Sequence, residues 1–85
     1  MNPCYKIKNK NSNQVVDVFD CKILDGVPII QWNDHGGDNQ LWQFIDTGSG
    51  FLKVKSKLCG KLLSVYCGSV ADGAEIVLWS DLDGD

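Results

Sequence analysis

The chain repeats itself with a period of 47 residues. Residues 5–38 align with residues 52–85 without a gap, and 11 of the 34 aligned pairs are identical. Chance would give about two or three identities at an ordinary composition. The identical pairs are Lys6/Lys53, Lys8/Lys55, Lys10/Lys57, Val18/Val65, Asp25/Asp72, Gly26/Gly73, Ile29/Ile76, Trp32/Trp79, Asp34/Asp81, Gly37/Gly84 and Asp38/Asp85. A fixed period of this size indicates copies of one supersecondary unit, each of which needs its neighbours to bury its apolar face.

Each repeat is predicted to consist of short β-strands. Apolar segments rich in β-branched and aromatic residues are separated by turn signals such as Asn11-Ser12-Asn13 and Asp25-Gly26, a pattern typical of β-hairpins. The predicted strands lie near residues 5–9, 15–19, 28–33 and 41–45 in the first repeat and near 51–55, 62–66 and 75–80 in the second. The second repeat has no counterpart of the fourth strand. We therefore expect an all-β chain in which no helix is required.

The length allows one small domain. The chain has 85 residues, whereas a typical domain has about 100–150. We expect residues 1–85 to form a single domain, with the first repeat at about 5–50 and the second, shortened repeat at about 51–85.

Composition excludes several classes of partner. The net charge is −3, with eight lysines and no arginine, so the basic field and the guanidinium fork that nucleic-acid-binding proteins use are missing, and no nucleic acid is expected. No apolar run approaches the roughly 18 residues that a membrane-spanning helix needs, so no membrane insertion is expected. The first residues lack the pattern of a signal peptide. That leaves two localisations open, a cytosolic protein or a fragment of a longer secreted one.

No metal or cofactor is expected. Cys4, Cys21, Cys59 and Cys67 form no CxxC pair, and His35 is the only histidine, whereas structural zinc requires closely spaced ligands of these types. Buried free thiols and one disulfide both remain open, with Cys59 and Cys67 the nearest pair in sequence.

Two motifs carry a resemblance to a known family. Gly26-x-x-Ile29-x-Gln31-Trp32 is followed by Asp38-Asn39-Gln40-Leu41-Trp42-Gln43-Phe44. Together they resemble the QxW-type repeat of the ricin-type β-trefoil lectins, a family that includes carbohydrate-binding modules of bacterial glycosidases. The resemblance extends from about Tyr5 to Asp85.

The resemblance implies an incomplete β-trefoil. The family fold has three four-stranded units around a pseudo-threefold axis, with six strands closing a barrel and three hairpins capping it. This chain supplies seven of those twelve strands, about one and two-thirds units. An open barrel exposes strand edges and apolar surface. We therefore expect a homo-oligomer or a part of a longer chain, and a stable, cooperative monomer would contradict this expectation.

The resemblance also implies a sugar site in the first repeat. Carried over position by position, Asp17 is the carboxylate that accepts hydrogen bonds from sugar hydroxyls, and Trp32 is the ring that stacks on the sugar. His35 falls at a loop position where a polar ring occurs in the family, and Asn39 with Gln40 forms its Asn-Gln pair. A sugar has an apolar C–H face and a rim of hydroxyls, so it needs both an aromatic ring and polar partners. Galactose-type and xylose-type sugars fit these residue kinds equally.

Each of these five residues also has a purely structural interpretation. Trp32 recurs as Trp79 and could hold the unit together, and Asp17 could be a solvated carboxylate, since strand alternation directs it away from the face of Val16 and Val18. His35 could be an ordinary surface residue, and Asn39 could cap the turn after Gly36-Gly37. Gln40 could orient the site or the loop. Trp42 and Phe44 are expected in the core.

The second repeat is predicted to lack a working site. Ser64 replaces Asp17, Leu82 replaces His35, and no Asn-Gln pair follows. One site per chain implies weak affinity unless several copies act together.

The sequence also bears on two other functional classes. An enzyme is not expected, because Glu75 is the only glutamate, no GxSxG motif occurs and the chain is short for a cleft with a supporting shell. A structural or protein-interaction trefoil without a sugar site is the alternative function. The joint presence of an acceptor and a stacking ring in the first repeat argues against it.

The lysines also recur in a regular pattern. Lys6, Lys8 and Lys10 recur as Lys53, Lys55 and Lys57 at a spacing of two, which places each triplet on one face of a strand. We expect both triplets to lie on solvated faces that oppose edge-to-edge pairing.

Overall fold

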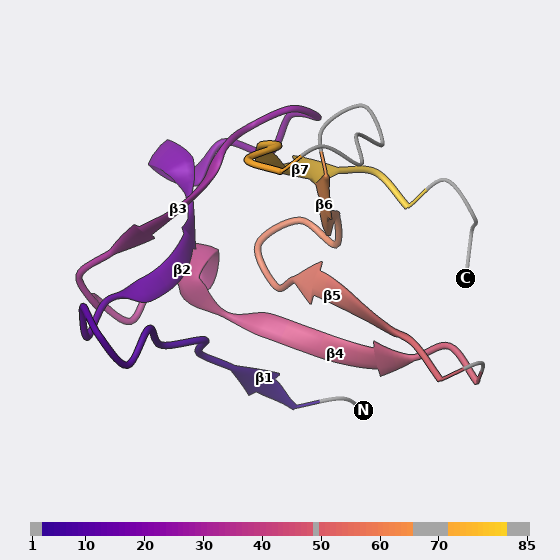
Figure 1. Cartoon of the computed structure of the whole chain (residues 1–85), viewed down its shortest axis with the longest axis horizontal. Helices are drawn as coiled ribbons and strands as arrows, with labels where there is room; N and C mark the ends of the chain where they lie inside the picture. Colours follow the sequence, from indigo (N-terminus) through magenta and orange to yellow (C-terminus); the bar gives the residue numbers. More distant parts are fainter. Residues whose placement is uncertain (1–2, 49, 66–71, 82–85) are drawn as a thin grey trace.

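The computed structural model describes residues 3–48, 50–65 and 72–81 and confirms the all-β prediction (Figure 1). In this part of the chain the only helical segments are single-turn 3₁₀ helices, η1 (Phe19–Cys21) and η2 (Asp38–Gln40). None of them is long and apolar enough to cross a membrane. The strands are β1 (Cys4–Tyr5), β2 (Val15–Val18), β3 (Ile29–Trp32), β4 (Trp42–Asp46), β5 (Leu52–Ser56), β6 (Leu62–Val65) and β7 (Ile76–Trp79).

The strands form two antiparallel sheets. One has the order β1-β4-β5-β6-β7, and the other is the β2–β3 hairpin, which lies to one side of the long β4–β5 ribbon in Figure 1. Isolated bridges continue the pairing between Lys8 and Val15 and between Pro28 and Val77. The first predicted strand is therefore shorter than expected, with regular pairing only at Cys4 and Tyr5.

The 47-residue period is visible in the hairpins. Strands β2 and β3 begin and end at residues whose counterparts, one period later, begin and end β6 and β7. The two hairpins are joined by backbone hydrogen bonds, because the Gly26 N–H donates to the Leu78 carbonyl at 2.7 Å and the Leu78 N–H donates to the Val27 carbonyl at 2.8 Å. Gly26 has a φ of 92°, a conformation that favours glycine, which explains the glycine at this turn.

A carboxylate strengthens the same junction. Asp25 accepts hydrogen bonds from Lys61 Nζ at 2.8 Å and from the backbone N–H and hydroxyl of Ser80 at 2.9 Å each. The hydrogen bond from Lys61 is the main reason that the pKa of Asp25 lies below its ordinary value.

The core lies between the β2–β3 hairpin and the five-stranded sheet. Val18, Val27, Trp42 and Leu78 form its fully enclosed cluster. The prediction for Trp42 is confirmed, since its side chain is completely buried and its indole N–H donates to the Val16 carbonyl at 3.1 Å. Phe44 is only half-buried and packs against Tyr5, with ring centroids 5.7 Å apart.

The lysine prediction is correct for one triplet and wrong for part of the other. Lys6 is well exposed and pairs with Asp34 at 2.8 Å. Its counterpart Lys53 makes the equivalent pair with Asp81 at 2.9 Å, but only 12% of its side chain is exposed. Asp81 is also largely enclosed, so Lys53 lies in a protected ion pair and not on a solvated face.

The cysteines are less buried than expected. Cys4, Cys21 and Cys59 are free thiols, Cys21 is exposed, and the other two are half-buried. The expectation of a buried thiol is therefore wrong for Cys21, which lies in a surface 3₁₀ turn. Cys67 is outside the described residues.

Candidate functional site

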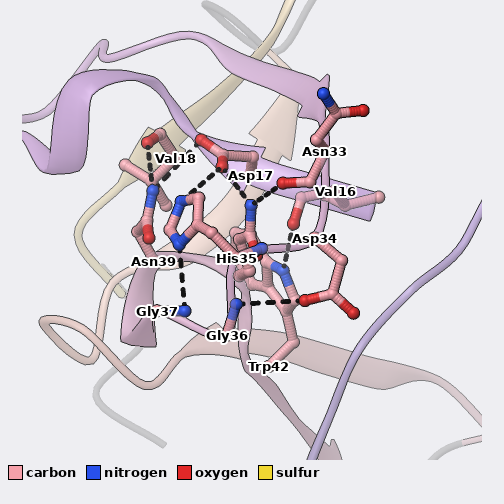
Figure 2. Close-up of polar contacts among 11 residues, drawn as sticks. Val16, Asp17, Val18, Asn33, Asp34, His35, Gly36, Gly37, Asn39 and Trp42 are labelled. Carbon is pink, nitrogen blue, oxygen red and sulfur yellow. Dashed lines mark hydrogen bonds and ion pairs between the residues drawn. The ribbon is translucent and has the colours of Figure 1, made fainter. Parts of the chain in front are cut away.

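The site is built around one buried carboxylate on the β2–β3 hairpin. Asp17 lies in β2 opposite Ile30 of β3, and only 3% of its surface is exposed. Strand alternation correctly predicted that Asp17 faces away from Val16 and Val18, but the interpretation as a solvated carboxylate is wrong. Residues 33–40 fold over this face of the hairpin and enclose Asp17 (Figure 2).

Two amide side chains hold the Asp17 carboxylate. Asn39 Nδ2 donates to one oxygen at 3.2 Å, and Gln40 Nε2 donates to the other at 2.9 Å. Hydrogen bonds to an ionised acceptor are the strong ones in proteins, and these two bonds join β2 to a turn more than 20 residues further along the chain. The acceptor is thus rigidly oriented before any ligand arrives.

Gln40 has no exposed surface, and its amide is fully used within the protein. Besides Asp17, its Nε2 reaches the Asn33 carbonyl at 2.8 Å, and its Oε1 accepts the backbone N–H of His35 at 3.0 Å. Gln40 therefore ties the loop to the hairpin. This geometry corresponds to the orienting role and leaves no group of Gln40 free for a ligand.

Asn39 is equally buried but is not equally satisfied. Its Nδ2 also donates to the Val18 carbonyl at 3.2 Å, whereas its Oδ1 is enclosed and has no hydrogen-bond partner. The turn-capping interpretation is wrong, because no side-chain hydrogen bond caps η2 and the amide points at β2 instead.

His35 lies at the mouth of the site with a defined ring orientation. Its Nδ1 accepts the backbone N–H of Gly37 at 3.1 Å, so in the neutral imidazole the proton is on Nε2. Nε2 lies 3.8 Å from Asp17 Oδ2. A side chain at Gly37 would prevent this placement, because a Cβ there would lie 2.6 Å from His35 Cε1 and 2.8 Å from Asn39 Oδ1.

Asp34 stabilises the same loop from outside. It accepts the Gly36 N–H at 3.0 Å and pairs with Lys6. The hydrogen bond from Lys6 is the first cause of its lowered pKa. Because its counterpart Asp81 makes the same type of pair with Lys53, we assign these aspartates a structural role.

Trp32 forms the exposed wall of a pocket above Asp17. Of its surface 55% is exposed, which is high for so large an apolar ring. The pocket has a volume of about 280 Å³ and is lined by Trp32, Asp17, His35 and Asn39. Four of the five residues singled out in the sequence therefore meet in one cavity, and Gln40 lies directly behind it.

Sequence reasoning missed the remaining wall. Phe19, Asp20, Cys21 and Ile30 also line the pocket. Asp20 and Cys21 both have a φ of 55°, a left-handed conformation that is uncommon outside glycine, asparagine and aspartate. A left-handed cysteine has no sequence signature, so this turn could not be anticipated.

The second repeat lacks the carboxylate at the position equivalent to the pocket. Ser64 and Trp79 are both half-buried, and no carboxylate stands at the Asp17 position. The residues equivalent to Phe19–Leu24 and to His35 are outside the described ranges.

The sequence model of the ricin-type β-trefoil lectin domain-like family matches residues 1–79. The chain belongs to this family. The resemblance seen in its QxW motif is thereby confirmed, and the strand arrangement is that of a partial β-trefoil. A ricin-type lectin fold has a general capacity for carbohydrate binding.

Solved structures of lectins and related proteins share the fold closely. An exo-β-1,3-galactanase from Clostridium thermocellum matches with 42% identity and a TM-score of 0.92, over 99% of this chain and 18% of that one. The designed threefold-symmetric protein ThreeFoil matches with 36% identity and a TM-score of 0.92, over 95% of this chain and 58% of its own. The ricin B-like lectin of Macrolepiota procera, solved with lactose, matches with 31% identity and a TM-score of 0.82, over 94% and 54%. This partial trefoil thus spans less than two thirds of each of these chains, and no curated protein matches it.

Proposed function

We propose that the first-repeat pocket binds a sugar of the galactose type. One observation carries the proposal: the exposed ring of Trp32 and the preoriented carboxylate of Asp17 line the same cavity. The ring offers a flat apolar surface to the C–H face of a pyranose, and the carboxylate offers acceptors to its hydroxyls. His35 Nε2 adds a donor at the rim, and Asn39 completes the polar side.

Two of the similar structures favour galactose over xylose. One neighbour is a galactanase and another was solved with lactose, a disaccharide that contains galactose. Xylose-type sugars have the same kinds of groups and remain the comparison in the test.

Binding, and not catalysis, is the activity we propose. The Asp17 carboxylate is engaged by two amide donors, as suits a fixed acceptor. The similarity to the galactanase covers only 18% of that enzyme, so its activity is not transferred to this chain.

A tryptophan-fluorescence titration with galactose, lactose, xylose and xylan oligosaccharides tests the proposal. Trp42 is buried and Trp79 half-buried, so a Trp32→Phe variant assigns the signal to the pocket. We expect a saturable change with galactose and lactose that is lost in Asp17→Ala. No change in a folded sample would contradict sugar binding and would favour the structural or protein-interaction trefoil.

We further propose that the chain works as a homo-oligomer. Val16 and Ile29 line an apolar groove of about 330 Å³ together with their repeat counterparts Leu63 and Ile76. The same two positions of both hairpins thus face one open groove, and a second copy can cover it with its own equivalent groove. Several copies would also compensate for the weak affinity of a single site.

Sedimentation equilibrium tests this assembly. We expect a concentration-dependent oligomer that dissociates in Ile76→Lys, because Ile76 is partly exposed in the groove and a lysine there would have to be buried. Leu24→Lys is the matched control, since Leu24 is exposed and does not line the groove. A monomer at all concentrations would contradict self-association and would leave the groove to be covered by further sequence.

A further inference from the structure

The charge of the pocket suggests which sugars it accepts. Among the described residues that line it, two are aspartates, Asp17 and Asp20, and none is a lysine. Three other aspartates of the first repeat have a lysine beside them, since Asp25, Asp34 and Asp38 each lie within 3.4 Å of a lysine nitrogen.

Asp20 differs from Asp17 in its exposure and in its partners among the described residues. Asp17 is buried and accepts two amide hydrogen bonds. Asp20 is exposed at the tip of η1, and no hydrogen bond or ion pair to another described residue occupies its carboxylate. Its charge is therefore available to whatever enters the pocket.

The backbone holds this charge at the pocket. Asp20 has φ 55° and ψ 24°, a left-handed conformation that aspartate and asparagine tolerate better than most residues. Asp20 is the second residue after β2 ends, so its position follows closely from the strand that carries Asp17.

We propose that Asp20 gives the pocket selectivity by charge, admitting neutral and cationic amino sugars and disfavouring uronic acids. This inference rests on the proposed sugar site. A carboxylate on the ligand would enter beside two aspartates without a lysine to balance them, whereas an ammonium group would find the free acceptor of Asp20. Two unit charges about 6 Å apart at a solvent-exposed site change affinity by about three- to tenfold, and salt screens the effect.

A series of sugars that differ only at C6 tests the proposal. The ligands are methyl galactoside, its 6-amino-6-deoxy analogue and methyl galacturonoside, titrated at pH 7.5 in low salt and again in high salt. We expect the amino sugar to bind about three- to tenfold more tightly than galactoside and the uronic acid to bind correspondingly more weakly. Both differences should shrink in high salt.

Asp20→Asn identifies the residue responsible. Asparagine keeps the left-handed turn and removes only the charge. We expect the variant to lose most of the discrimination between the charged analogues, with each affinity expressed relative to that of methyl galactoside measured on the same variant. Glu75→Gln is the control, because it changes the net charge equally at an exposed residue that does not line the pocket.

The possible failures are distinguishable. If the three ligands bind with equal affinity, or if Asp20→Asn discriminates as the native protein does, charge selection by Asp20 is refuted while sugar binding stands. If none of the three ligands binds, the sugar site is refuted and the selectivity with it. A loss of discrimination in Glu75→Gln equal to that in Asp20→Asn would also overturn the proposal, because net charge alone would then explain it.

Discussion

Replacing Asp17 by asparagine should weaken both the fold of the loop and its binding of sugar. The substitution conserves shape but turns one acceptor oxygen into an NH₂ group, which must face the donor amide of Asn39 or of Gln40. Those bonds are 3.2 and 2.9 Å long and almost fully enclosed. A hydrogen bond to a charged group contributes about 1.5–3 kcal/mol, and this range sets the order of magnitude of the free energy lost with one of them.

The expected loss in the free energy of unfolding is about 1–2 kcal/mol, at or just below the lower end of that range. Asn39 and Gln40 each retain a second acceptor, the Val18 and Asn33 carbonyls, so neither amide is left without a partner. Removing a buried charge also relieves some desolvation. Urea unfolding monitored by circular dichroism measures this quantity.

The expected loss in affinity is larger. A sugar hydroxyl would lose its charged acceptor, and a change of about 1.5–3 kcal/mol corresponds to roughly 10- to 150-fold in Kd. Ser64→Ala, at the equivalent position of the second repeat, is the control and should leave affinity unchanged. A folded Asp17→Asn protein that binds within twofold of the native affinity would refute the role we give this carboxylate, as would equal losses from both substitutions.

Two further predictions concern the loop and the junction between the hairpins. Gly37→Ala should abolish most sugar binding, because its Cβ would displace the His35 ring. Gly36→Ala has open space for its Cβ but a φ of 78°, so it should lower the free energy of unfolding by about 1 kcal/mol and leave sugar affinity unchanged. Sugar titration and urea unfolding of both variants test this, and the reverse pair of outcomes would contradict it. The Lys61 hydrogen bond lowers the pKa of Asp25 below 3.8, so the stabilisation by this carboxylate should be complete above that pH and disappear as pH falls through the lower pKa of the folded state. Comparing urea midpoints of the native protein and Asp25→Asn from pH 6 to acid should show a difference that closes at low pH, and a constant difference would contradict this linkage.

The strands were predictable because alternation and turn residues are local signals. The hairpin of Val15–Val18 with Ile29–Trp32 was located within a residue or two, and the direction of Asp17 followed from the period of the strand. The enclosure of Asp17 was not predictable, because it depends on Gln40, which is distant in sequence and arrives only through the fold of the loop. The different exposure of Lys6 and Lys53 was likewise not predictable, because the two lysines occupy equivalent positions of the repeat and only their surroundings in the fold differ.

The site also contained a signal that sequence reasoning could not use. Phe19, Asp20 and Cys21 follow Asp17 immediately, so their proximity to the site could have been suspected. Their orientation depends on two consecutive left-handed residues, which nothing in the residue types requires. Resemblance to the ricin-type lectins identified the residues that the family shares but could not identify a wall that belongs to this chain.

All of the described pocket lining comes from one continuous stretch, residues 17–39, and the amide that braces it from behind belongs to the next residue. A duplication of the unit therefore copies the whole pocket at once, with no interface to be reshaped. Conversely, a single difference such as Ser64 in place of Asp17 removes the carboxylate from one copy and leaves the other copy unchanged. In a protein of this architecture the number of pockets that carry the carboxylate can change by single substitutions, independently of the strands that support them.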